Sequence, residues 1–163
     1  MALALYQLLK PVNKNMALLM VLFVLAAVPI GMLNELNNFA VLLLLSGADY
    51  LKVFTADQLQ ALVMLFLDLH KLGLPIAHIF WGLWLFPMGY LVFRSGFLPR
   101  ILGVLMVIGC LGYLIQSVAA FLLPSFKLNI IFFTSWGELL LPLWLVIKGV
   151  IVEQWERRAL ESA

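Results

Sequence analysis

The sequence predicts an all-α integral membrane protein: a helical bundle of four transmembrane helices plus one amphipathic helix at the membrane surface. Apolar residues make up 65% of the 163 residues and charged residues 11%, and the mean hydropathy is +1.11. A soluble domain carries about 25% charged residues. The apolar residues form runs near the ~20 residues that one span needs. Basic residues are scattered between these runs instead of clustering with aromatic residues, so nucleic-acid binding is not expected.

Four apolar runs of span length lie in one transmembrane domain, residues 1–163. They cover residues 16–33, 75–93, 99–123 and 128–148. Between the second and third runs, Gly96 suits the end of one helix and Pro99 suits the first turn of the next. These two spans are therefore expected to form a tight hairpin.

Small residues predict how the spans pack. Gly82 and Gly89 lie seven residues apart on one helical face, and Gly109 and Gly112 leave part of another helix without side chains. Because small residues let helix backbones approach closely, we expect tight helix contacts. After the last span, Trp155 is expected to lie on a continuation of that helix, as an anchor at the membrane surface.

The basic residues predict that both termini lie in the cytoplasm. Seven of the ten Lys and Arg residues lie on the side of the termini, and three lie on the opposite side. On the first side are Lys10, Lys14, Arg94, Arg100, Lys148, Arg157 and Arg158, and on the second are Lys52, Lys71 and Lys127. Cytoplasmic loops carry the excess of Lys and Arg in membrane proteins, which sets this orientation.

The region between the first two spans has a less regular pattern. Residues 39–45 are apolar and either extend the first helix or form a separate piece at the surface. Thr55 and Gln58 have the spacing of a capping box, and Gly73 is a typical helix stop, so we expect a helix over residues 56–72. Its charged stripe predicts that it lies in the outer interface. The stripe consists of Asp57, Gln60, Asp68 and Lys71.

Several short blocks are specific enough to compare with a known family. They are Leu9-Lys10-Pro11-Val12-Asn13, Leu45-Ser46-Gly47-Ala48-Asp49-Tyr50, Phe80-Trp81-Gly82, Gly89-Tyr90, Arg94-Ser95-Gly96, Pro99-Arg100, Leu102-Gly103, Gly137-Glu138, Trp144-Leu145 and Lys148-Gly149. Over nearly its whole length the chain resembles the domain of unknown function 4386 family of bacterial multi-pass membrane proteins. The resemblance implies this fold and a location in the bacterial inner membrane. It implies no biochemical activity. It also implies a further N-terminal portion, so residues 1–9 are expected to be the tail of a helix in a shortened chain.

Glu138 is the most informative polar residue, because it lies about ten residues from either end of its span. An ionisable group at the bilayer centre costs at least ~2.5 kcal/mol, so we expect a protonated Glu138 that faces the interior. Thr134 and Ser135 share its helical face, and Pro142 predicts a kink. Two interpretations stay open: a proton or ligand site, and a neutral side chain that hydrogen bonds to a neighbouring helix as structural glue.

Four further polar side chains are candidates for a site near the outer membrane surface. His78 and Gln116 each lie about 5 Å below that surface by the ~1.5 Å rise per residue. Glu35 ends the first span at the same level, and His70 projects from the apolar face of the surface helix. These residues form either the mouth of a cavity that leads toward Glu138 or an ordinary wet interface.

No metal or other cofactor is predicted. Asp68 and His70 point about 200° apart on one helix. Glu138 lies about 10 Å deeper than His78 by the same helical rise, so these side chains do not converge on a metal ion. The sequence has no nucleophile motif with a base and no Gly-rich phosphate loop. An intramembrane enzyme is therefore the least favoured class.

We expect a non-enzymatic bundle that binds a small or lipid-like ligand, or a partner helix, through Glu138 and the outer polar residues. The alternative is a proton-coupled transporter with Glu138 as its proton carrier, although transporters usually show repeats with matching broken helices. The expected partners are membrane lipids, with Arg94 and Arg100 at their headgroups, and a partner helix or a second copy of the chain.

Overall fold

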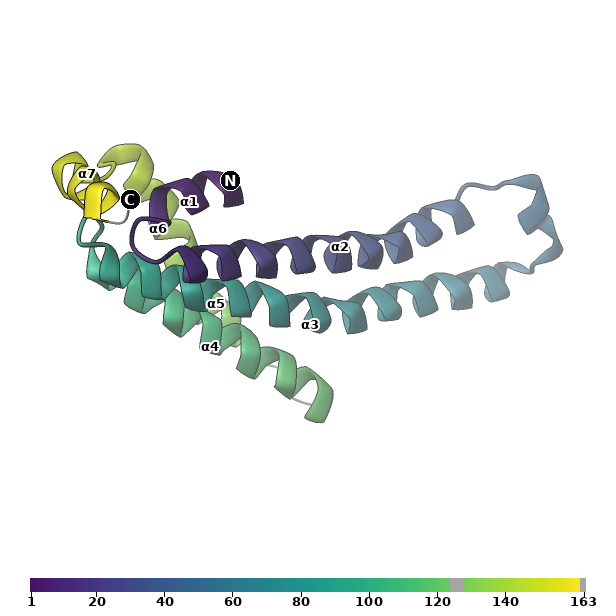
Figure 1. Ribbon diagram of the computed structural model, residues 1–163. Coiled ribbons are helices and arrows are strands. Elements are labelled where there is room, and N and C mark those ends of the chain that lie inside the picture. The colour runs from purple at the N-terminus through teal and green to yellow at the C-terminus, as the bar shows by residue number, and fades with distance from the viewer. Residues whose placement is uncertain (124–127, 162–163) are drawn as a thin grey trace.

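The computed structural model describes residues 1–123 and 128–161, which are helical almost throughout (Figure 1). This confirms the predicted all-α bundle. In order, the elements are α1 (Ala2–Leu9), α2 (Lys14–Leu44), the 3-10 helix η1 (Asp49–Val53), α3 (Ala56–Ser95), α4 (Arg100–Leu122), α5 (Ile130–Thr134), α6 (Trp136–Ile147) and α7 (Val152–Glu161).

Helices α2 and α3 form a long antiparallel hairpin that extends beyond the other helices (Figure 1). With 31 and 40 residues, they are about 46 and 60 Å long at ~1.5 Å per residue. Both exceed the ~30 Å thickness of the hydrocarbon core of a bilayer. Because α2 continues to Leu44, residues 39–45 extend the first helix, which was one of the two alternatives.

The expected helix end at Gly73 is wrong, because residues 56–72 are the first part of the continuous helix α3. Pro75 lacks an N–H group, which favours a break locally. Packing against α2 outweighs this signal: the Asn34 side chain occupies the space beside Gly73 where a Cβ would lie. Asn34 Nδ2 also donates a hydrogen bond to the His70 carbonyl at 3.0 Å. The location of residues 56–72 at the outer surface stays a prediction.

Both ends of α3 follow their local signals. The predicted capping box is present: Thr55 Oγ1 accepts from Gln58 N at 3.3 Å, and Gln58 Oε1 accepts from Thr55 N at 2.9 Å. At the other end Gly96 adopts a left-handed conformation with φ 79°, which a residue with a side chain rarely adopts. Pro99 then caps α4, one residue before the helix begins.

The crossing of α3 and α4 is built on glycines, and Gly82 and Gly89 make the tight helix contacts that were expected of them. A Cβ on Gly89 would lie 2.7 Å from the Gly103 carbonyl oxygen, and a Cβ on Gly103 would lie 2.6 Å from the Gly89 carbonyl oxygen. Gly82 makes room for Tyr113, whose Cβ would lie only 2.8 Å from an added methyl group. The hydrophobic core surrounds this crossing, with Leu85 and Met88 fully buried.

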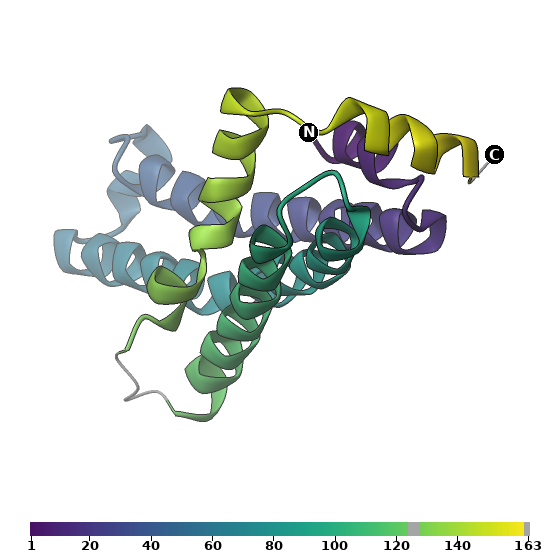
Figure 2. The same ribbon diagram turned by 90° about the vertical axis from the view of Figure 1, so that its left-hand side faces the viewer.

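Helix α7 is a separate element and not a continuation of the last span, which corrects the expectation for Trp155. Gly149 interrupts the chain with φ 67°. Ile151 N then donates to the Phe97 carbonyl at 3.3 Å, and Trp155 Nε1 donates to the Leu8 carbonyl at 2.9 Å. The first bond ties the residue before α7 to the turn between α3 and α4, and the second holds α7 against α1, which it crosses in Figure 2.

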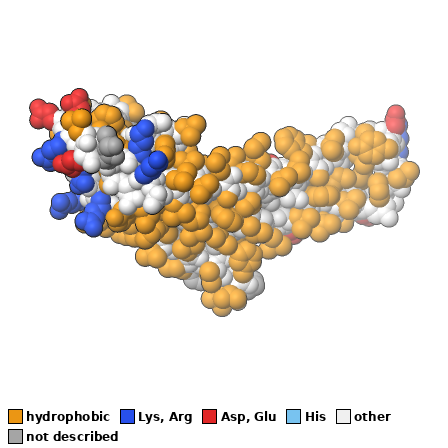
Figure 3. Space-filling model, in the orientation of Figure 1, with side chains coloured by type: hydrophobic (Ala, Val, Ile, Leu, Met, Phe, Trp, Pro, Cys, Tyr) orange, Lys and Arg blue, Asp and Glu red, His pale blue; other side chains and the backbone are white. Residues whose placement is uncertain are grey.

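Four helices are long and apolar enough to span a membrane, and they are α2, α3, α4 and the combined segment Ile130–Ile147. Apolar side chains cover most of the visible surface, whereas Lys and Arg gather at the end that holds both termini (Figure 3). The chain therefore has the character of a multi-pass membrane protein. The cytoplasmic placement of the termini stays a prediction, and Lys127, which was counted for it, lies outside the described residues.

Candidate functional site

Glu138 lies in the first turn of α6, directly after a break in the last span. The predicted continuous segment 128–148 is divided at Ser135 into α5 and α6, so a break precedes Glu138, and α6 continues through Pro142. Thr134 Oγ1 donates back to the Ile130 carbonyl at 3.1 Å, a contact that often bends helices. The bend sets the direction in which α6 presents Glu138.

Two glycines bring α5 and α6 close to α4. Thr134 packs into the space that a side chain on Gly112 would fill. A Cβ on Gly137 would lie 2.9 Å from the backbone carbon of Leu105 and 2.9 Å from the backbone nitrogen of Met106. Because these contacts involve backbone atoms, they fix the turn that carries Glu138 against α4.

The Glu138 side chain is half-buried and reaches an apolar cavity. Its Oε1 atom is buried and has no hydrogen-bond partner within residues 1–123 and 128–161. The Tyr113 side chain of α4 lies near the same carboxyl group. The cavity beside Glu138 measures about 170 Å³. It is lined by Met1, Leu5, Trp84, Met88, Met106, Glu138, Leu141, Pro142 and Leu145.

His78 points into the bundle and contacts Tyr113. The two ring centres are 5.5 Å apart in an edge-on arrangement, and the His78 ring lies 5.3 Å from Trp81 on the same helix. Tyr113 lies in turn near Glu138. Three side chains that can carry a proton thus lie near one another in succession, from α3 through α4 to α6.

His70 belongs to a different group of polar residues, between α2 and α3. Its Nδ1 lies 3.2 Å from Asn34 Nδ2 and 3.5 Å from Asn38 Nδ2. Asn38 Nδ2 also donates to the exposed Glu35 carboxylate at 2.8 Å, and Asn37 Nδ2 donates to the Asn34 carbonyl at 3.0 Å. The contacts of Asn34 and Asn38 with His70 tie α2 to α3, whereas the other two bonds lie within α2.

The structure divides the predicted outer polar residues among three places. Gln116 Oε1 accepts from Ile130 N at 2.8 Å and so supports the start of α5. His78 contacts Tyr113, and His70 lies eight residues earlier on α3, about 12 Å away along the helix. A ligand or proton role for each of these residues stays a prediction.

Arg94 and Arg100 frame the turn between α3 and α4. The Arg94 guanidinium lies 5.9 Å from the centre of the Tyr90 ring, and the Arg100 guanidinium lies 5.8 Å from that of Phe93. Arg158 Nη2 donates to the Arg94 carbonyl at 3.2 Å. Both arginine side chains are exposed, and their contact with lipid headgroups stays a prediction.

Across the described residues, no three His, Cys, Asp or Glu side chains converge as metal ligands. Sequence reasoning missed Tyr113, although a signal was present. Tyr113 lies one turn beyond Gly109 on the glycine-rich face of α4, and a buried tyrosine hydroxyl usually finds a hydrogen-bond partner. That requirement pointed to a polar partner on a neighbouring span.

The model of the DUF4386 family, described as a domain of unknown function, matches residues 1–149. An uncharacterized protein of Archaeoglobus fulgidus is 33% identical over 153 residues, which cover 91% of this chain and 74% of the relative. No solved structure matches. The relative is archaeal, so a bacterial origin stays a prediction. The chain belongs to the DUF4386 family, a family defined by a domain of unknown function.

Proposed function

We propose that the protein is a non-enzymatic membrane bundle that binds an apolar ligand bearing one hydrogen-bonding group. The Glu138 carboxyl group holds that polar group, and the cavity between α1, α3, α4 and α6 holds the apolar part. One observation carries the proposal: a buried carboxyl oxygen without a hydrogen-bond partner among the described residues lies beside an apolar cavity. A buried polar atom left unpaired is costly, and a ligand that pairs with it removes that cost.

The cavity volume limits the size of the bound group. At about 170 Å³, it is close to the ~150 Å³ cavity that accepts a benzene ring. It therefore suits a ring-sized group or a short segment of chain, such as one end of a lipid-like molecule. Met1 and Leu5 of α1 line one side, so this short helix covers the bound group.

A pair of small molecules separates the polar contact from the apolar one. The compound p-cresol carries a hydroxyl group where p-xylene carries a methyl group, and the two have nearly the same shape. One added hydrogen bond contributes about 0.5–1.5 kcal/mol, so p-cresol is expected to bind roughly 2- to 12-fold more tightly. Binding is measured as the saturable rise in melting temperature of the purified protein.

Variants of Glu138 complete this test. Glu138→Gln keeps an acceptor and a donor in nearly the same shape, so it should retain the preference for p-cresol. Glu138→Leu should lose that preference, whereas the matched control Glu35→Leu, which changes an exposed glutamate outside the cavity, should keep it. Equal binding of the two compounds to the wild-type protein would contradict the proposal.

The contacts among His78, Tyr113 and Glu138 favour a second candidate, proton-coupled transport. In this case the three side chains pass a proton between α3 and α6. Vesicles that contain the protein and an internal pH dye should then show proton uptake that Glu138→Gln and Tyr113→Phe abolish. The Glu138→Gln variant distinguishes the two functions, because it retains ligand binding but cannot carry a proton.

A further inference from the structure

A second cavity lies at the end of the molecule that holds both termini, where the connection from α1 to α2 passes beside α7. Its volume is about 770 Å³, within the ~300–1,000 Å³ of ligand pockets. It shares no lining residue with the Glu138 cavity. It is lined by Tyr6, Lys10, Pro11, Val12, Asn13, Lys14, Asn15, Trp155 and Ala159.

Hydrogen bonds within the protein hold the walls of this cavity. Trp155 Nε1 donates to the Leu8 carbonyl at 2.9 Å, which fixes α7 beside α1. Lys10 N donates to the Tyr6 carbonyl at 2.8 Å, which ends α1 in a regular turn. Asn13 Oδ1 accepts from the backbone of α2 at 3.0 Å. The cavity is therefore shaped by contacts that need no ligand.

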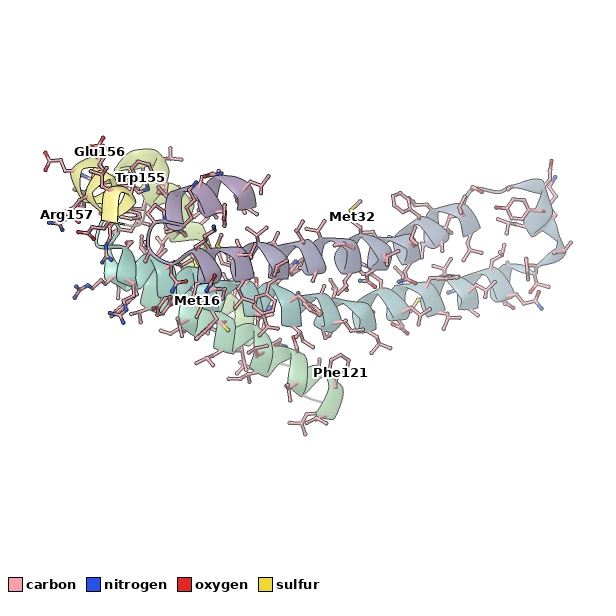
Figure 4. The ribbon with its side chains drawn as sticks, in the orientation of Figure 1. Met16, Met32, Phe121, Trp155, Glu156 and Arg157 are labelled. Carbon is pink, nitrogen blue, oxygen red and sulfur yellow. The ribbon has the colours of Figure 1, made fainter. Side chains whose placement is uncertain are left out.

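Two of the described residues that line the cavity are lysines, Lys10 and Lys14, and none of the described lining residues is Asp or Glu. Both ion pairs formed within the described ranges lie elsewhere, Asp49 with Lys52 and Asp68 with Lys71. Lys10 and Lys14 are exposed and belong to neither pair. On α7, the charged side chains labelled in Figure 4 project outward from the bundle. An anion in this cavity would thus meet two lysines that form no ion pair with any carboxylate of the described residues.

We infer that this cavity binds a phosphate ester. Two lysine ammonium groups match the charge of a phosphate monoester, and lysine is a common phosphate ligand. The volume exceeds that of phosphate alone, so the Tyr6 and Trp155 rings can contact the organic part of the ester. Because the cavity lies at the basic end of the bundle, a phospholipid headgroup and a soluble phosphate ester are two sources of the same chemistry.

The test compares two double variants of the full chain. Lys10→Gln with Lys14→Gln removes both charges from the cavity, and Lys52→Gln with Lys71→Gln removes two exposed charges elsewhere. The proteins are placed in phosphatidylcholine nanodiscs that contain a minor fraction of phosphatidic acid. Retained lipids are counted by native mass spectrometry. Glycerol 3-phosphate is titrated separately against the protein in detergent.

Removal of the two cavity lysines is expected to weaken phosphate binding about 30-fold, because one lysine near an anionic surface contributes roughly a fivefold gain. The control pair should behave like the wild type, and Lys10→Arg with Lys14→Arg should restore most of the binding. Retention of phosphatidic acid that depends on Lys10 and Lys14, without binding of glycerol 3-phosphate, assigns the site to a lipid. Direct binding of glycerol 3-phosphate assigns it to a soluble ester. Binding of both probes that does not depend on Lys10 and Lys14, or no binding of either, would overturn the inference.

Discussion

Replacing Gly89 by alanine is expected to destabilise the bundle, although alanine is the better helix former. The added Cβ would lie 2.7 Å from the Gly103 carbonyl oxygen, 2.9 Å from Val107 Cγ2 and 3.0 Å from Met106 Cβ. The carbonyl oxygen and the Met106 Cβ move only with α4 itself. One methyl group must therefore push the two helices apart at their closest crossing.

The size of the effect follows from two opposing terms. Overpacking a tight contact costs about 1–3 kcal/mol, and replacing a helical glycine by alanine gains about 0.5–1 kcal/mol. A net loss of roughly 1–2 kcal/mol lowers the melting temperature of a chain of this length by about 2–8 °C. Unfolding can be followed with a thiol-reactive dye, because Cys110 is the one cysteine of the sequence and is buried.

Gly31→Ala in α2 is the matched control. There the added Cβ would lie 3.7 Å from Trp81 Cζ2, an ordinary van der Waals contact. Only the gain in helix propensity remains, so the melting temperature should rise by about 1–4 °C. The two variants are thus expected to shift stability in opposite directions. A Gly89→Ala protein as stable as Gly31→Ala would refute the proposed tight crossing.

Three further predictions concern topology, α7 and the hairpin. Single cysteines at Asp49 and Glu161, in a Cys110→Ala background, should react with an impermeant thiol reagent from opposite sides of the membrane, and labelling of both from one side would contradict the predicted orientation. Trp155→Phe removes the hydrogen bond to α1, worth about 0.5–1.5 kcal/mol, and should speed hydrogen exchange in α7 while leaving α3 and α4 unchanged. Asn34→Leu removes the donor to the His70 carbonyl and should speed hydrogen exchange in the middle of α3. Uniform protection of the amides along α3 in this variant would contradict the prediction.

The sequence was sufficient wherever structure depends on local chemistry. The capping box at Thr55 and the left-handed turn at Gly96 formed as predicted, because each satisfies backbone groups within a few residues. The glycine pattern also predicted close helix contacts, since a missing side chain on one face allows approach whichever helix is the partner; it did not predict that α3 and α4 form the crossing. The helical membrane class followed from composition.

Where the prediction failed, contacts between distant segments decide the structure. Gly73 and Pro75 carry strong helix-ending signals, but Asn34 lies 39 residues before Gly73 in the sequence and packs against it. The break at Ser135 depends on Thr134 fitting against Gly112 of another helix. The same limit applies to the site. Glu138 was identified from the sequence because an ionisable side chain in the middle of a span costs free energy. Its position near Tyr113 depends on how α4 and α6 pack, which the sequence does not show.

The central claim is that the Glu138 carboxyl group receives the polar group of a ligand in the apolar cavity. Infrared difference spectroscopy tests it directly, with the Glu138 carboxyl band identified by its loss in Glu138→Gln. Addition of p-cresol should shift that band, because the carboxyl group gains a hydrogen bond, and p-xylene should leave the band in place. A carboxyl band that neither compound shifts, or that both shift equally, would contradict the account.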